Sequence, residues 1–271
     1  MPIATYATYK NYIQNENKSQ TYVINGNAGT AGRANNYFML GLPAQTAPTT
    51  AVAPTNTTNT AFPLPTVSGT RRLKFIGGNA MSYLSGGYGI LIDILSHQGG
   101  LAGNLATTQT TNLPTAALTR NTDGLGVMIG LTIYTQIGAT TTTVSATYTN
   151  QAGTGSRVTP LTTIGNTGYR EATRMILLPL QYGDTGVKSV ESVTLTATTG
   201  TAGNFGVTLF KPLGVFAIDE LGRSNDFDFV TGRMPGGIAD VTGACLTLLM
   251  YPSVNATAQI LTKLQIMETA N

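Results

Sequence analysis

Apolar and polar residues alternate along much of the chain after residue 71, which is the pattern of half-buried β-strands. In residues 143–149 the apolar Val144, Ala146 and Tyr148 fall on one face, and hydroxyl-bearing residues fall on the other. The pattern predicts nine strands, over residues 73–76, 89–95, 127–135, 142–149, 174–180, 190–197, 205–210, 244–250 and 259–267.

Two of these segments carry further information. Residues 175–178 are apolar on both faces, which predicts a strand that is covered twice. Residues 199–204 are rich in Gly and Thr, and they predict a hairpin between the strands at 190–197 and 205–210. Short strands, frequent turn signals and almost no helical periodicity together predict an all-β chain, specifically a jelly-roll-like antiparallel β-sandwich with an extended N-terminal arm.

The first 70 residues differ from the rest. Residues 41–65 contain five prolines among Thr, Ala and Asn, so neither a helix nor a central strand can persist there, and an extended arm or long loop is expected. Tyr6, Tyr9 and Tyr12 recur at a spacing of three. They form one face of a short helix, anchor an arm on a neighbour, or pack on their own domain. We therefore divide the chain into an arm (1–70) and a sandwich domain (71–271).

Charge limits the possible functions. Only 10% of the residues are charged, the formal net charge is +3, and Arg71, Arg72 and Lys74 form the one basic cluster. Because phosphate-backbone binding needs a concentrated basic face, no nucleic-acid partner is expected. No stretch approaches the about 20 consecutive apolar residues of a membrane-spanning helix, and the first residues lack a secretory leader pattern, so neither a membrane nor Sec export is expected.

Few residues of the chain are candidates for catalysis or metal binding. With His97 as its only histidine, the chain cannot build a two-histidine metal site. His97 is either a base beside Ser96 or, as we favour, a satisfied polar residue at a strand end; Cys245 is expected to be small and buried. Asp226 and Asp228 are weak candidates for a Ca²⁺ site against the simpler alternative of a surface acidic patch. No enzyme activity, cofactor or small-molecule ligand is expected.

Several sequence segments resemble those of structural proteins of tailed-bacteriophage virions, the small β-rich proteins on or beside the head shell. The resemblance spans residues 91–213, about half of the chain, and is clearest in residues 96–101, 111–120, 165–180 and 183–213, including TTGTAGNFGVTLF at 198–210. It implies a virion component, often a homotrimer, that reinforces or decorates the capsid lattice.

A charge-poor, strand-rich chain with an uncharged arm suits permanent contact with copies of itself. The resulting expectation is a decoration or cement subunit that is assembled in the host cytoplasm and bound to the major capsid protein. Its expected partner contacts, through buried aromatic rings and bidentate arginines, are Tyr6, Tyr9, Tyr12, Arg33, Arg71 and Arg72.

Two alternatives stay open. A tail or fibre protein would bind host glycan through loops at one end of the sandwich; 12 Tyr but no Trp weaken this interpretation slightly. A jelly-roll capsid shell subunit would need a basic N-terminal arm to package nucleic acid, and this arm has no such run.

Overall fold

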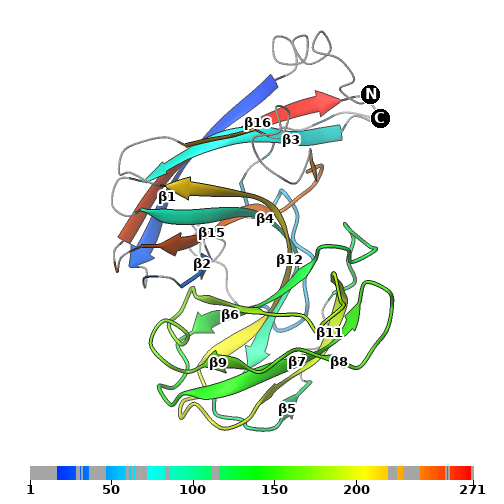
Figure 1. Cartoon of the computed structure of the whole chain (residues 1–271), viewed down its shortest axis with the longest axis vertical. Coiled ribbons are helices and arrows are strands. Elements are labelled where there is room, and N and C mark those ends of the chain that lie inside the picture. The colour runs from blue at the N-terminus through cyan, green and yellow to red at the C-terminus, as the bar shows by residue number, and fades with distance from the viewer. Residues whose placement is uncertain are drawn as a thin grey trace.

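Figure 1 shows the computed structural model of the chain. The structure describes residues 17–28, 31, 33–36, 47–58, 61–62, 64, 67, 72–82, 86–110, 116–218, 225–228, 239–253, 255 and 257–269. All regular elements in these ranges are strands, and every named pair of strands is antiparallel, so the predicted all-β, antiparallel class is confirmed.

Three sheets build the molecule. The upper sheet holds β1 (Asn17–Ala28), β16 (Thr257–Thr269), β3 (Arg72–Ser82), β13 (Asn225–Asp228) and β14 (Ala239–Asp240). The central sheet follows the order β10 (Met175–Leu178), β6 (Met128–Thr135), β12 (Asn204–Ile218), β4 (Gly87–Leu101), β15 (Leu246–Pro252) and β2 (Asn35–Asn36). The lower sheet holds β5 (Thr108–Gln109), β11 (Val187–Leu195), β7 (Thr142–Asn150), β8 (Arg157–Val158) and β9 (Thr162–Ile164).

Each of the nine predicted segments contains a strand. The burial of β7 alternates between buried and half-buried along its whole length, as its sequence predicts. β10 is covered on both faces, because Ile176 and Leu178 face the lower core while Met175 belongs to the cluster on the opposite face. β1 lies inside the segment expected to be an arm, and it pairs with β16 from Asn17 onward. The division of the chain at residue 70 stays a prediction.

The central sheet serves two cores from one face. On β4, Ile92 and Ile94 belong to the cluster on one face of the sheet, and Leu91 and Leu95 point to the other face. Leu91 packs in the upper core with Leu248 and Leu264, whereas Leu95 packs in the lower core with the inner residues of β7 and β11. The upper and lower sheets therefore cover the same face of the central sheet at its two ends, as Figure 1 shows.

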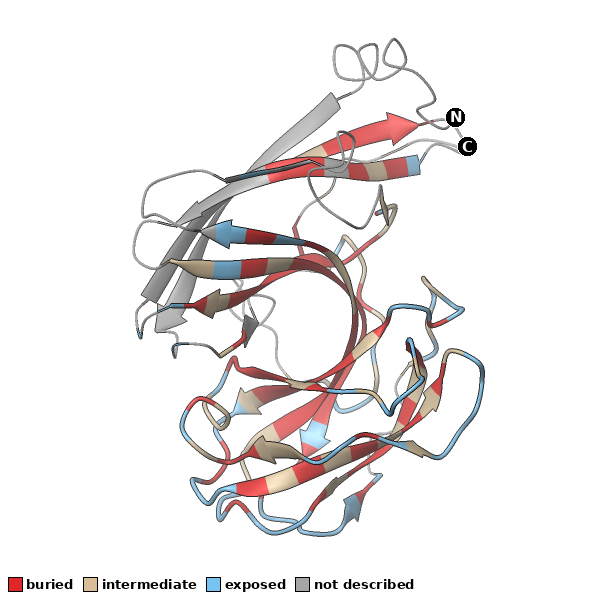
Figure 2. Cartoon of the chain, viewed as in Figure 1, coloured by how far each residue is buried: buried red, intermediate tan, exposed pale blue. Residues whose placement is uncertain are grey.

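The central sheet bends where the two cores part. Asp93 lies midway between Leu91 and Leu95 and opposite Lys211 of β12. The register between β4 and β12 shifts on both sides of this pair, because Leu95 of β4 and Leu213 of β12 have no opposite residue. Such β-bulges bend a strand and increase its twist. Figure 2 shows that the middle of these long strands is buried. Asp93 thus places a carboxylate, 3% exposed, at the bend.

Arg120 neutralises this carboxylate. Its Nε and Nη2 donate to the two oxygens of Asp93 at 3.0 and 2.8 Å, and Nη2 also donates to the carbonyl of Ile94 at 2.9 Å. The backbone N–H of Cys245 donates to Asp93 at 2.8 Å. Burial raises the pKa of Asp93, and the hydrogen bonds and charge of Arg120 oppose that rise.

The predicted hairpin over residues 199–204 is wrong. β11 belongs to the lower sheet, where β7 and β5 occupy its two edges, and β12 belongs to the central sheet between β4 and β6. The connection therefore crosses between sheets. Thr199, fully buried, donates from its N–H and its Oγ1 to the carbonyl of Gly103, and its Oγ1 accepts the N–H of Gly138. A Cβ at Gly138 would lie 1.8 Å from the Thr199 carbonyl oxygen, so the crossing needs glycine there.

Part of the Pro-rich segment lies along the chain's own central sheet. β15 ends its pairing with β4 at Asp93, which leaves the next residues of that edge of β4 without a strand. Val52 and His97 exchange both backbone hydrogen bonds, and Gly99 donates to the carbonyl of Pro48. Proline suits such a position, because an edge residue need not donate on both sides.

We predict that Arg120→Ala lowers the free energy of unfolding by about 3–5 kcal/mol, because it leaves a buried carboxylate unpaired. The control is Lys74→Ala at the exposed Lys74–Asp240 pair, whose side chains are 30% and 41% exposed. That change should cost about 0–1 kcal/mol. Urea unfolding of both variants measures the difference, and equal, small losses would contradict the role of Asp93–Arg120.

Candidate interaction surface

The structure describes two of the six residues that were expected to contact a partner. Tyr6, Tyr9, Tyr12 and Arg71 lie outside the described residues. Arg72 begins β3 and is exposed, opposite Thr269 of β16. Arg33 lies just before β2 and is half-buried. Of this set, Arg33 is the residue around which the structure gathers further side chains.

Arg33 lies over an aromatic ring. Its guanidinium carbon is 4.2 Å from the ring centroid of Tyr169, which is a cation–π geometry. Tyr169 belongs to the loop between β9 and β10 and packs against the lower core. The backbone N–H of Met175 donates to the carbonyl of Ala34 at 3.1 Å, and this bond holds the Arg33 segment beside the start of β10.

Two further tyrosines extend this group. Tyr88 of β4 and Tyr251 of β15 are directly opposite in register, and their rings stack with centroids 4.5 Å apart and an interplanar angle of 10°. Burial and the neighbouring Tyr88 and Tyr169 raise the pKa of Tyr251. Tyr88 is 44% exposed. The aromatic group therefore joins the central sheet to the loop that contains Tyr169.

Charges lie on the same loop. Arg170 Nε is 3.5 Å from Glu171 Oε1, and both side chains are partly exposed. Arg174 is buried, and burial lowers its pKa while Glu171 opposes the shift. Thr173 has a φ of 73°, an uncommon value for a β-branched residue, and such strain concentrates at functional sites.

We call Arg33, Tyr88, Tyr169, Arg170 and Tyr251 the Arg/Tyr surface. Arginine and tyrosine are enriched at protein interfaces and among the residues that dominate binding energy. Tyrosine contributes area at a low cost in side-chain entropy, and a guanidinium pairs with carboxylates through two parallel hydrogen bonds. This surface can bind an acidic protein face. The sequence signalled Arg33, but nothing in it links the three tyrosines to that residue.

The groups considered for catalysis are arranged differently. His97 is 3% exposed, its Nδ1 lies 2.9 Å from the Tyr134 hydroxyl, and burial lowers its pKa to about 4. Ser96 pairs with Leu209 and His97 with Thr208, so the two side chains point to opposite faces of β4. Ser96 Oγ instead accepts the N–H of Ala116. Cys245 is buried as expected, and burial raises its thiol pKa. These groups do not form a nucleophile–base pair.

The candidate metal ligands lie on β13. This strand pairs with β3 from Asn225 to Asp228, and Asp226 is exposed. Within the ranges that the structure describes, no group of three or more His, Cys, Asp and Glu residues could hold a metal ion. No helix in those ranges has the length and apolar character needed to cross a membrane.

No family model matches the chain, and no curated protein matches it. Similar solved structures include infectious bursal disease virus, Gt strain, at 9% identity and a TM-score of 0.20, with 94% of this chain and 81% of that chain covered. A VP2 subviral particle of the same virus gives the same values. A VP2 mutant assembled as T=1 particles gives 9% identity and a TM-score of 0.23, with 93% and 77% covered. TM-scores this low carry no functional argument.

We predict that His97 makes the protein less stable in mild acid. Its folded-state pKa of about 4 lies below the unfolded value of 6.5, so its contribution is fully present above pH 6.5 and is lost as the pH falls towards 4. The loss reaches about 3 kcal/mol. Urea unfolding at neutral pH and near pH 4 should show a smaller pH effect in His97→Asn than in the wild type; an equal pH effect would contradict the assignment.

Proposed function

We propose that this chain is a non-enzymatic virion structural protein, a decoration or cement subunit that binds the outer surface of a bacteriophage capsid. The observation that carries the proposal is the Arg/Tyr surface. In a chain with only 10% charged residues, it places Arg33 over Tyr169 and brings Tyr169 close to the stacked Tyr88 and Tyr251. Arg170 follows Tyr169 on the same loop. The residues come from β4, from β15 and from two loops that are distant in the sequence.

The chemistry of this surface fits a protein partner with exposed carboxylates. Arg33 and Arg170 supply guanidinium groups, and the Tyr88–Tyr251 stack supplies a flat ring that is part-exposed. Interfaces of this composition obtain affinity from the rings and specificity from the charges. The major capsid protein is the proposed partner.

The groups that the structure describes also favour a structural role over catalysis. The carboxylates of Asp93 and Asp184 are held by Arg120 and Arg157, respectively. His97 and Cys245 are buried. A low charge content and a rigid β scaffold suit a subunit that stays in permanent contact with a lattice.

The test measures binding of the purified chain to capsids that lack it, by co-sedimentation. We predict that the wild type binds saturably and that Arg33→Ala weakens binding about tenfold or more, because a central arginine contact at an interface is worth roughly 2 kcal/mol. Higher salt should weaken binding of the wild type more than that of the variant.

The matched control is Lys188→Ala, which removes one positive charge from β11 in the lower sheet. It should bind as the wild type does. If both variants lost binding equally, the loss would come from net charge alone. Full binding by Arg33→Ala would exclude the Arg/Tyr surface as the contact. No binding by the wild type would overturn the decoration proposal itself.

A further inference from the structure

A second surface, on the lower half of the molecule, carries an exposed aromatic ring on a rigid turn. Tyr182 is 101% exposed. It lies in a β-turn closed by the Asp184 N–H, which donates to the carbonyl of Gln181 at 3.0 Å. Gly183 has a φ of 89°, and a Cβ there would touch nothing, so its backbone conformation alone favours glycine. A tyrosine side chain offers a large apolar area together with a hydroxyl for a partner to contact.

Asp184 anchors the turn to the neighbouring strands β7 and β8. Its carboxylate accepts hydrogen bonds from the Tyr148 hydroxyl, from Asn150 Nδ2 at 2.7 Å, and from Arg157 Nε and Nη2 at 2.9 and 3.2 Å. Arg157 and the Tyr148 hydroxyl lower the pKa of Asp184 to about 2. Its charge, and with it the anchor, therefore persists at neutral pH and is lost only as the pH falls through about 2.

Further hydrogen bonds fix both ends of the turn. The Gln181 N–H donates to the Tyr148 hydroxyl at 2.9 Å. The N–H groups of Thr185 and Gly186 both donate to Gln151 Oε1. The backbone that carries Tyr182 is thus fixed before any partner arrives, which lowers the entropy cost of binding.

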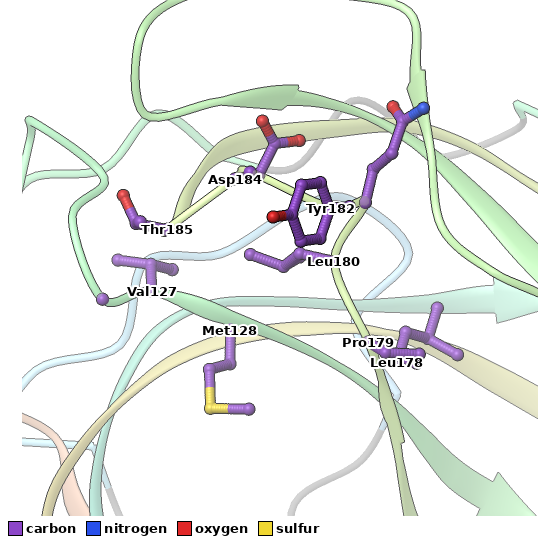
Figure 3. A pocket seen from close by; sticks show the side chains of 11 residues that line it. Val127, Met128, Leu178, Pro179, Leu180, Tyr182, Asp184 and Thr185 are labelled. Carbon is purple, nitrogen blue, oxygen red and sulfur yellow. The ribbon is translucent and has the colours of Figure 1, made fainter.

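A hollow of about 420 Å³ lies directly beside Tyr182. Figure 3 shows Val127 and Met128 on one side of it, Leu178 and Pro179 on the other, and Leu180 next to the tyrosine ring. Its volume lies in the range of pockets that hold small ligands, and it exceeds the volume of one aromatic side chain. A protruding ring and an apolar hollow are therefore neighbours on one patch of surface.

A patch that contains both a knob and a hole is complementary to itself. Across a two-fold axis, the ring of each copy meets the hollow of the other, and both sites are filled at once. The Arg157–Asp184 ion pair beneath the turn is neutral as a unit, so it does not oppose this contact. We propose that Tyr182 and the adjacent hollow form a contact between two copies of this chain, with the ring of each copy in the hollow of the other.

This contact concerns the protein alone, so it is tested without capsids and stands apart from the proposed function. Sedimentation velocity over a range of concentrations should show reversible association of the wild type. We predict that Tyr182→Ala weakens it at least tenfold. Leu161→Ala, which removes a side chain that is 62% exposed elsewhere on the lower half, should leave association unchanged.

A second experiment identifies the contact even if other surfaces also associate. The chain has one cysteine, Cys245, which is buried, so an introduced surface cysteine is the accessible thiol. Under mild oxidation, a mixture of Tyr182→Cys and Met128→Cys proteins should form a disulfide-linked pair. A mixture of Tyr182→Cys and Leu161→Cys should not.

Three results would overturn the proposal: a wild type that is monomeric at every concentration, association that Tyr182→Ala leaves intact, or equal disulfide formation in the two mixtures. Binding of the wild type to immobilised glycans that is lost in Tyr182→Ala, with no association between copies, would reassign the ring to a sugar.

Discussion

The pairing of Asp93 with Arg120 is the constraint on which the arrangement of the two cores depends. A carboxylate in the middle of a buried strand is tolerated only when its charge and its hydrogen-bonding capacity are satisfied. Arg120 and the N–H of Cys245 do this from two separate segments. Because Asp93 lies between Leu91 and Leu95, its pairing fixes the point at which the upper core ends and the lower core begins.

The bend at this point decides which surfaces the molecule presents. Strands β4 and β12 continue through both halves, and the upper and lower sheets pack on the same face of the central sheet at its two ends. The opposite face carries Ile92, Phe210 and Tyr251, and Tyr251 stacks on Tyr88. The loop with Tyr169 reaches this stack from the lower half, so the Arg/Tyr surface exists only because the two halves are held in a fixed relation.

Much of the fold could be predicted from the alternation of apolar and polar residues, because each side chain on a strand takes its face from its position alone. All nine predicted strands are present for this reason. The partner of each strand is not contained in that pattern. Residues 199–204 have the composition of a hairpin turn, yet they connect two sheets, since β11 and β12 both have other neighbours on each edge.

The Arg/Tyr surface was even less visible in the sequence. Arg33 could be singled out, because an arginine can form a bidentate pair with an acidic group of a partner. Tyr88, Tyr169 and Tyr251 lie up to 163 residues apart, and only the pairing of β15 with β4 and the course of one loop bring them together. The sequence does not single out Asp184. Its partners Asn150 and Arg157 lie on β7 and β8, and only the folding of the lower sheet brings them to Asp184.

The most direct test of the central claim is the copy number and location of this chain in purified particles, by quantitative mass spectrometry and imaging of the same sample. A decoration role predicts many copies over the head, in fixed ratio to the main shell subunit. A few copies confined to the tail or to one vertex, or no copies at all, would contradict it.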